Sequence, residues 1–113
     1  GKEGAVVMEQ IRVVLVTTPR DEARKMARLI VESRLAACVN IVPKIDSYFW
    51  WDEAVQTEEE ALLIIKSTAA KFAALRDFVE EHHPYDLPEI IALPLVDGFS
   101  EYINWVHAET SKE

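Results

Sequence analysis

The sequence has little cysteine, little glycine and no long apolar run. Its 113 residues include a single cysteine, Cys38, so the chain can form no internal disulfide and no paired-cysteine zinc site. Only three glycines occur, at positions 1, 4 and 98, and none of them supplies a phosphate-binding loop after the first predicted strand. No apolar stretch approaches the roughly 20 residues that span a bilayer. These absences argue against a disulfide-stabilised, phosphate-cradling or membrane-spanning protein.

Basic residues are also scarce. Twelve Lys and Arg stand against twenty Asp and Glu, which gives a net charge of −8. Because such a chain repels phosphate backbones and anionic lipid, we expect neither nucleic acid nor a membrane as a partner. The N-terminus lacks the order of basic, apolar and small residues of an export signal, so we predict a cytoplasmic protein. Residues 1–8 are interpreted as a flexible leader or expression remnant before a single domain over residues 9–113.

The hydrophobic pattern predicts alternating strands and helices. A first strand over residues 10–17 leads into an amphipathic helix that has Thr18 or Asp21 as its N-cap and ends near Ser33. The remaining predicted elements are strands at residues 37–51 (broken at Pro43), 55–67 and 90–96, and helices at residues 69–82 and 100–109. This order predicts an α+β class protein, a ferredoxin-like βαββαβ sandwich with a C-terminal helix.

Aromatic residues in the second strand indicate an oligomer. Tyr48, Phe49, Trp50 and Trp51 are consecutive, and because strand side chains alternate they point to both faces of a sheet that helices cover on one side only. Residues 62–65 (LLII) are apolar in succession, which predicts burial on both faces. We therefore expect a homo-oligomer. The alternative is that the C-terminal helix covers the second face within one chain.

Residues with metal-binding side chains gather where the second long helix must end. His82 and His83 precede Pro84, which stops the helix, and Asp86 and Glu89 follow it. Imidazole suits copper, zinc and nickel, and copper(II) binds most strongly in the usual order. The alternative is that one histidine caps the negative end of the helix dipole while the other packs under a loop.

Other reactive side chains give weaker signals. Cys38 lies in an apolar strand, where a free cysteine usually behaves as a small buried hydrophobe, although it could meet the histidine pair across the sheet. In an enzyme, His83 would act as a base and Lys66 as an electrostatic stabiliser, but no residue stands out as a nucleophile. We therefore expect no enzymatic activity.

Several short blocks between about Ile11 and Val106 form a pattern found in a known family. The blocks are Thr18-Pro19, residues 34–40 (RLAACVN), Tyr48 with Trp50-Trp51, Lys66-Ser67-Thr68, His83-Pro84-Tyr85, Pro88-Glu89-Ile90, and Tyr102 with Trp105. With these blocks the chain resembles the CutA divalent-cation tolerance family. The resemblance implies a PII-like homotrimer of ferredoxin-like subunits with a role in tolerance of divalent metals, copper in particular.

The resemblance also implies a metal site. It places copper ligands on the histidines that match His82 and His83, and on a cysteine near the end of the first strand. Val16 occupies that cysteine's position here, and an aliphatic side chain cannot coordinate metal. Cys38 matches another family cysteine and is the remaining candidate thiol. Copper or another divalent metal is thus an expected ligand, and no cofactor is required.

A second implication is a ligand cleft between subunits. The resemblance lines it with Ser47, Trp50, Lys66, Tyr85 and Glu89, together with His83. A small ligand bound there would be sensed as PII proteins sense theirs, because aromatic walls with a few convergent polar groups are what a ligand pocket requires. A third interpretation, a trimer that is purely a structural scaffold, uses the same residues for packing.

Overall fold

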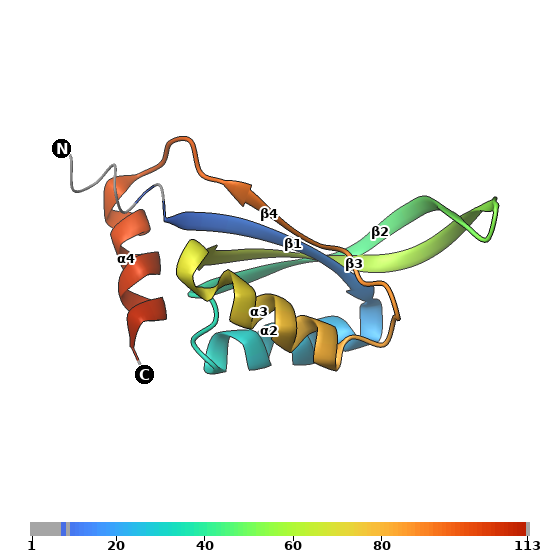
Figure 1. Cartoon of the computed structure of the whole chain (residues 1–113), viewed down its shortest axis with the longest axis horizontal. Helices are drawn as coiled ribbons and strands as arrows, with labels where there is room; N and C mark the ends of the chain where they lie inside the picture. Colours follow the sequence, from blue (N-terminus) through green and yellow to red (C-terminus); the bar gives the residue numbers. More distant parts are fainter. Residues whose placement is uncertain (1–7, 9, 113) are drawn as a thin grey trace.

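The computed structural model describes residue 8 and residues 10–112 (Figure 1). Of the predicted leader over residues 1–8, only Met8 belongs to the described part, and it packs beside Ile11 and Ile103. The elements in chain order are β1 (Ile11–Pro19), the 3₁₀ turn η1 (Arg20–Glu22), α2 (Ala23–Glu32), β2 (Cys38–Trp51), β3 (Ala54–Thr68), α3 (Ala69–His82), β4 (Ile90–Pro94) and α4 (Ser100–Ser111). This order confirms the predicted ferredoxin-like α+β fold with an additional C-terminal helix.

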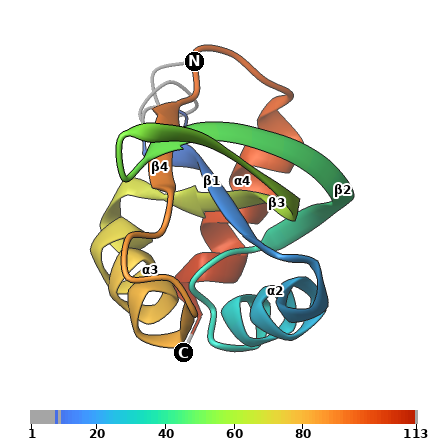
Figure 2. The same cartoon turned by 90° about the vertical axis from the view of Figure 1, so that its right-hand side faces the viewer.

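The four strands form one antiparallel sheet in the order β2-β3-β1-β4. Figure 2, which looks along the molecule, shows α2 and α3 side by side against the same face of this sheet. Each βαβ crossover therefore returns its helix to that face, as the handedness of such connections requires. The arrangement leaves the other face without a helix along most of its length.

The hydrophobic core lies between the sheet and the two helices. Val14 and Val16 of β1 are fully buried there, because alternate residues of a strand point to one face. They join an apolar cluster to which α2 contributes Met26 and Ile30 and α3 contributes Leu75. Full burial of such a side chain stabilises the fold by about 1.5–3 kcal/mol. Val16 stands where the resemblance places a cysteine, and its side chain is fully buried in this apolar core.

The start of the first helix differs from its predicted start. Thr18 stays in β1, opposite Ala61 of β3, and the chain then makes the turn η1 before α2 begins at Ala23. Neither Thr18 nor Asp21 caps the helix, since Pro19 and Glu22 occupy the cap positions and neither makes a side-chain cap bond. The prediction was wrong because strand pairing with β3 holds Thr18 in extended geometry.

The second sheet face is only partly covered within one chain. Helix α4 packs Ile103 and Val106 onto Ile11 at one end of this face. Leu62 and Ile64 are half-buried, whereas their neighbours on the helix side are fully buried. The prediction that residues 62–65 are buried on both faces is therefore not met in a single chain. Helix α4 covers one end of the second sheet face and leaves the rest of that face uncovered.

Strands β2 and β3 extend beyond the other strands as a hairpin arm, residues 46–59 (right-hand side of Figure 1). Asp52 and Glu53 form its predicted turn with φ values of 54° and 61°, the left-handed conformation that a tight hairpin turn of this kind uses. The pairing register shifts between Val42 and Ile45, so Pro43 lies at an irregularity, as predicted. The arm carries the consecutive aromatic residues away from the core.

Candidate histidine corner and ligand groove

Helix α3 ends at the histidine pair as predicted. Its last residue is His82, and His83 is already extended, with φ −83° and ψ 137°. Pro84 accounts for this, because its ring excludes α geometry for the residue before it. His82 remains exposed, while only 8% of His83 is accessible to solvent. The two rings therefore lie in different environments.

Both ring nitrogens of His83 are bound to backbone groups. Nδ1 lies 3.1 Å from the amide nitrogen of Tyr85, which can only donate. Nδ1 is therefore the acceptor, and Nε2 carries the proton that it donates to the Thr17 carbonyl oxygen at 2.7 Å. His83 thus joins the loop after α3 to the end of β1 and has no lone pair left for a metal.

His82 bonds to its own helix. Its Nδ1 lies 2.8 Å from the Phe78 carbonyl oxygen, and the imidazole stacks on the Phe78 ring with centroids 4.1 Å apart. A carbonyl oxygen accepts, so Nδ1 donates and Nε2 keeps its lone pair. The two histidines therefore have the structural roles that we expected as the alternative to metal binding. His82 bonds to the end of its helix, and His83 packs under a loop. His82 Nε2 is the ring nitrogen of the pair that is available to a metal ion.

Cys38 lies far from the histidine pair. It opposes Lys66 on β3, and Lys66 in turn opposes Val13 of β1. The His83 bond reaches Thr17, four residues further along β1, which is about 13 Å at the rise of a strand. The Cys38 thiol instead lies 3.8 Å from Asn40 Oδ1 and beside Tyr102, whose pKa is raised first by burial and then by the negative charge and the hydrogen bond of the Cys38 sulfur. The structure therefore does not bring the predicted ligands together.

In the described part of the chain, no three His, Cys, Asp or Glu side chains lie together so that they could hold a metal ion. Copper and zinc sites in proteins have three or four such donors. The residues of a single chain thus do not fit a preformed site for the divalent metal that the sequence pattern implies.

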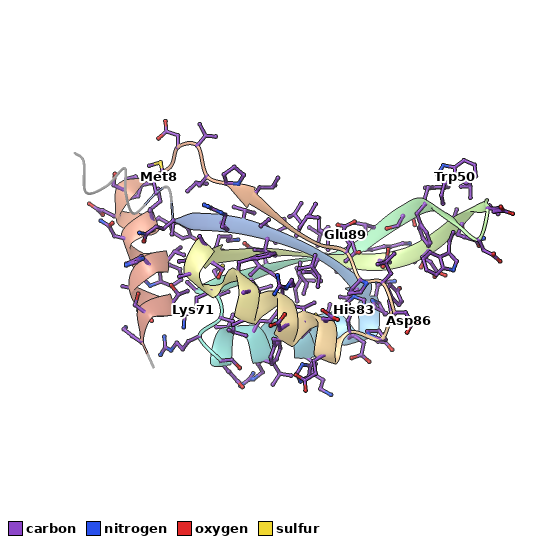
Figure 3. All side chains as sticks on the ribbon, viewed as in Figure 1. Met8, Trp50, Lys71, His83, Asp86 and Glu89 are labelled. Carbon is purple, nitrogen blue, oxygen red and sulfur yellow. The ribbon has the colours of Figure 1, made fainter. Side chains whose placement is uncertain are left out.

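Four of the six predicted cleft residues line one groove, and His83 and Lys66 do not. Ser47, Trp50, Tyr85 and Glu89 surround a hollow of about 600 Å³ between the hairpin arm and the loop after α3. Figure 3 shows Glu89 and Asp86 near the point where the arm leaves the sheet and Trp50 further along it. Lys66 lies elsewhere, with its ammonium bonded to Asn40 Oδ1 and 3.5 Å from the Ile64 carbonyl oxygen.

The groove also contains a buried carboxylate, Glu60, that the sequence reasoning missed. Only 4% of Glu60 is exposed, although acidic side chains are rarely buried without a partner. It lies beside Tyr85, and burial, then the Glu60 charge and hydrogen bond, raise the pKa of Tyr85 to about 12. A signal was present: Glu60 alternates with Leu62 and Ile64, so it falls on the partly buried sheet face.

The fold defines the class of the protein. The sheet, the crossover helices and the extended hairpin place the chain among ferredoxin-like α+β proteins. A family model described as CutA1 divalent ion tolerance protein matches residues 12–109. The chain belongs to this CutA1 family, as its sequence blocks predicted.

Known relatives agree over most of the chain. The divalent-cation tolerance protein CutA of Thermus thermophilus is 46% identical over 99 residues, which cover 87% of this chain and 96% of that protein. The chloroplastic protein CutA 1 of Oryza sativa subsp. japonica is 48% identical over 99 residues, which cover 87% of this chain. That match spans only 56% of the rice protein's length.

Solved structures show the same fold. CutA1 from Oryza sativa superposes with a TM-score of 0.89 at 42% identity, covering 95% of this chain and 99% of that one. The PII-like protein CutA from Nostoc sp. PCC 7120 has a TM-score of 0.83 at 32% identity, covering 88% of this chain and 97% of that one.

The described residues include no helix long and apolar enough to cross a membrane.

Proposed function

We propose that this chain acts in the response to divalent metal ions as a homotrimer that contacts metal at the histidine corner. The observation that carries the proposal is the match to the CutA1 divalent ion tolerance family over residues 12–109. The family is named for ion tolerance and not for a reaction, and we propose no catalysis. A cytoplasmic location stays a prediction from the sequence.

The partly covered sheet face supports the oligomer. Ile91 and Leu93 of β4 lie on this face and are 48% and 46% exposed in a single chain. Their positions opposite Leu15 and Val13 extend the half-buried apolar surface across the sheet. A second copy that covers it would remove this apolar area from water, which is the usual driving force for association. Sedimentation equilibrium should give three times the chain mass of 12.9 kDa.

A metal would first meet His82, because its Nε2 is open at the surface. His83 and Cys38 remain proposed ligands, but His83 must give up a backbone bond to coordinate and Cys38 lies about 13 Å along the strands from the histidine pair, so we expect the single chain to bind copper(II) weakly. Calorimetric titration of metal-free protein with copper(II) and with zinc tests this. We expect binding to be lost in His82→Ala and retained in His107→Ala, a histidine on α4. Unchanged affinity in His82→Ala would contradict the proposed contact.

A second candidate function is a PII-like small-ligand sensor, and the groove at the base of the arm favours it. Its hollow of about 600 Å³ falls in the size range of ligand pockets. A thermal-shift screen at millimolar ligand tests this function, because any ligand selective for the folded protein raises the melting temperature. A trimer that responds to neither metals nor small molecules would instead fit the structural-scaffold interpretation.

A further inference from the structure

Three arginines form a stripe along the outer side of the first helix. Arg20, Arg24 and Arg28 recur every four residues through η1 and α2, so their side chains lie on one side of the helix. All three are exposed. Met26 and Ile30 are buried on the opposite side, which packs on the sheet. The arginine stripe therefore faces away from the core.

The arginine stripe stays outside the proposed oligomer. Helices α2 and α3 cover one face of the sheet (Figure 2), whereas the proposed subunit contact uses the opposite face, which carries Ile91 and Leu93. Because the sheet lies between α2 and that face, association leaves α2 on the outer surface of each subunit. A homotrimer would present three arginine stripes.

The protein neutralises the charge of the stripe only in part. Arg24 takes part in no ion pair among the described residues. Arg28 Nε lies 2.7 Å from Glu32 Oε1 of the same helix, and an exposed pair of this kind is weak enough to be exchanged for another carboxylate. Arg20 Nη1 lies 3.9 Å from Glu59 Oε2. Positive charge at Arg24 and Arg28 is thus available to a partner.

The spacing of the arginines is unfavourable for the helix by itself. Like charges four residues apart repel each other and destabilise a helix. Arg24 has such a neighbour on each side, Arg20 before it and Arg28 after it. The repeated arginine therefore does not stabilise α2, whereas carboxylates of a partner placed along the stripe would offset the repulsion.

The stripe matches carboxylates on a second helix. Four residues of a helix rise about 6 Å, so Glu side chains at this spacing in a partner can face the arginines one to one. Arginine binds a carboxylate through two parallel hydrogen bonds. Val31 continues the stripe three residues after Arg28 and is 38% exposed, so it offers an apolar contact. A nucleic acid fits less well, because the chain has a net charge of −8 and the stripe contributes three cations.

We propose that Arg20, Arg24, Arg28 and Val31 form a docking surface for an acidic helical segment of a partner protein. The negative charge elsewhere on the chain does not prevent docking, since exposed charges more than about 8 Å apart are largely screened at physiological ionic strength. Three stripes on one trimer would also allow multivalent binding. This surface is separate from the histidine corner and the groove, so the inference goes beyond the functions proposed for them.

Three peptides of matched length test the chemistry of the partner. They are alanine-based helices of about 16 residues that carry Glu, Gln or Lys at three positions spaced four apart. Each is titrated into the full-length protein while its backbone amide signals are followed by NMR. We expect the Glu peptide to shift the signals of η1 and α2, and the Gln and Lys peptides to leave them unchanged. Signals of α4, on another part of the molecule, are the internal control.

Two variants locate the contact. Arg24→Gln removes one charge of the stripe and should weaken the Glu peptide at least about threefold. Arg76→Gln, at an exposed arginine on α3, makes the same change in net charge and is the matched control, which should bind as the wild type does. Both variants should fold, because both positions are exposed and Gln is a good helix former.

Each result decides the proposal. Shifts of the α2 signals by the Glu peptide alone, weakened in Arg24→Gln and not in Arg76→Gln, support it. Equal binding of the Gln peptide, equal weakening in the two variants, or unmoved α2 signals at about 5 mM Glu peptide would overturn it. A short single-stranded DNA that binds at α2 more tightly than the Glu peptide would assign the stripe to nucleic acid and would also overturn it.

Discussion

The Nε2 atom of His83 donates a hydrogen bond of 2.7 Å to the carbonyl oxygen of Thr17. This bond joins the loop that follows α3 to the end of the central strand β1. The same loop continues through Tyr85 to Glu89 and forms one wall of the groove. In the single chain, a histidine that the sequence presents as a candidate metal ligand therefore supports one wall of the groove.

The first prediction concerns the contribution of the His83–Thr17 hydrogen bond to the stability of the fold. His83→Ala leaves the Thr17 carbonyl oxygen without its partner, and an unsatisfied buried polar group costs about 1–3 kcal/mol. The free energy of unfolding, measured by urea denaturation at one fixed protein concentration, should fall by that amount. His82→Ala is the matched control and should change it by less than about 1 kcal/mol, because His82 is exposed. Equal losses in both variants would contradict the assigned roles.

The second prediction concerns alkaline pH. The pKa of Tyr85 is about 12 in the folded protein, above the ordinary value of 10. Between these values the unfolded chain has lost the phenolic proton while the folded chain retains it, so stability falls as pH rises from 10 to 12. Urea denaturation at pH 9 and pH 11 should show this loss, and Tyr85→Phe should reduce it. The same loss in Tyr85→Phe would show that other groups cause it.

A third prediction follows from the cause of that pKa shift. Burial is the largest cause, and the Glu60 charge and hydrogen bond come next. Glu60→Gln should therefore lower the pKa of Tyr85 only part of the way to its ordinary value. Absorbance at the tyrosinate band during alkaline titration, compared with Tyr85→Phe, identifies the Tyr85 component. An unchanged pKa of Tyr85 in Glu60→Gln would contradict the contact between Tyr85 and Glu60.

A fourth prediction tests the partly covered sheet face. Ile91 is 48% exposed in a single chain, so Ile91→Glu should leave the chain folded. If this face is the subunit interface, the same substitution buries a charge on association and should dissociate the trimer to monomers. Val31→Glu is the control, because Val31 is similarly exposed, at 38%, but lies on α2. Sedimentation velocity distinguishes the outcomes, and an intact Ile91→Glu trimer would exclude this face as the interface.

A fifth prediction concerns the attachment of α4. Arg34 Nη1 lies 2.7 Å from Glu109 Oε2, and hydrogen bonds from Lys112 and then from Arg34 hold the pKa of Glu109 below its usual value. A lowered carboxyl pKa stabilises the fold above the ordinary pKa, and this contribution is lost as pH falls through the folded value. Glu109→Gln should speed amide hydrogen exchange in α4 at neutral pH. Exchange in α4 as slow as in the wild type would contradict this role.

Local signals in the sequence were sufficient for some elements. The bounds of α3 match the predicted residues 69–82, because Thr68 Oγ1 accepts from the Lys71 amide at 3.2 Å at one end and Pro84 stops the helix at the other. Both signals act between residues that are neighbours in the chain. The start of α2 was predicted wrongly because a contact with β3, distant in sequence, holds Thr18 in the strand.

The residues of the candidate site also divide into those that sequence motifs indicated and one that only the fold revealed. Aromatic and acidic residues of the groove were recognised because the family blocks include Trp50, Tyr85 and Glu89. Glu60 was missed, since in the sequence it is the last residue of an acidic run that resembles a solvated surface. Only the base of the arm, where β1, β2 and β3 meet, buries it.

The sequence by itself determined the element order, the end of α3 and membership of the CutA1 family, because these depend on local side-chain periodicity, on proline and on short motifs. The tertiary structure decided what the candidate ligands do. Sheet register places Cys38 about 13 Å along the strands from the histidine pair, and backbone bonds occupy both nitrogens of His83. Distances between strands and competition for hydrogen bonds are properties of the folded chain, so residue types alone could not predict them.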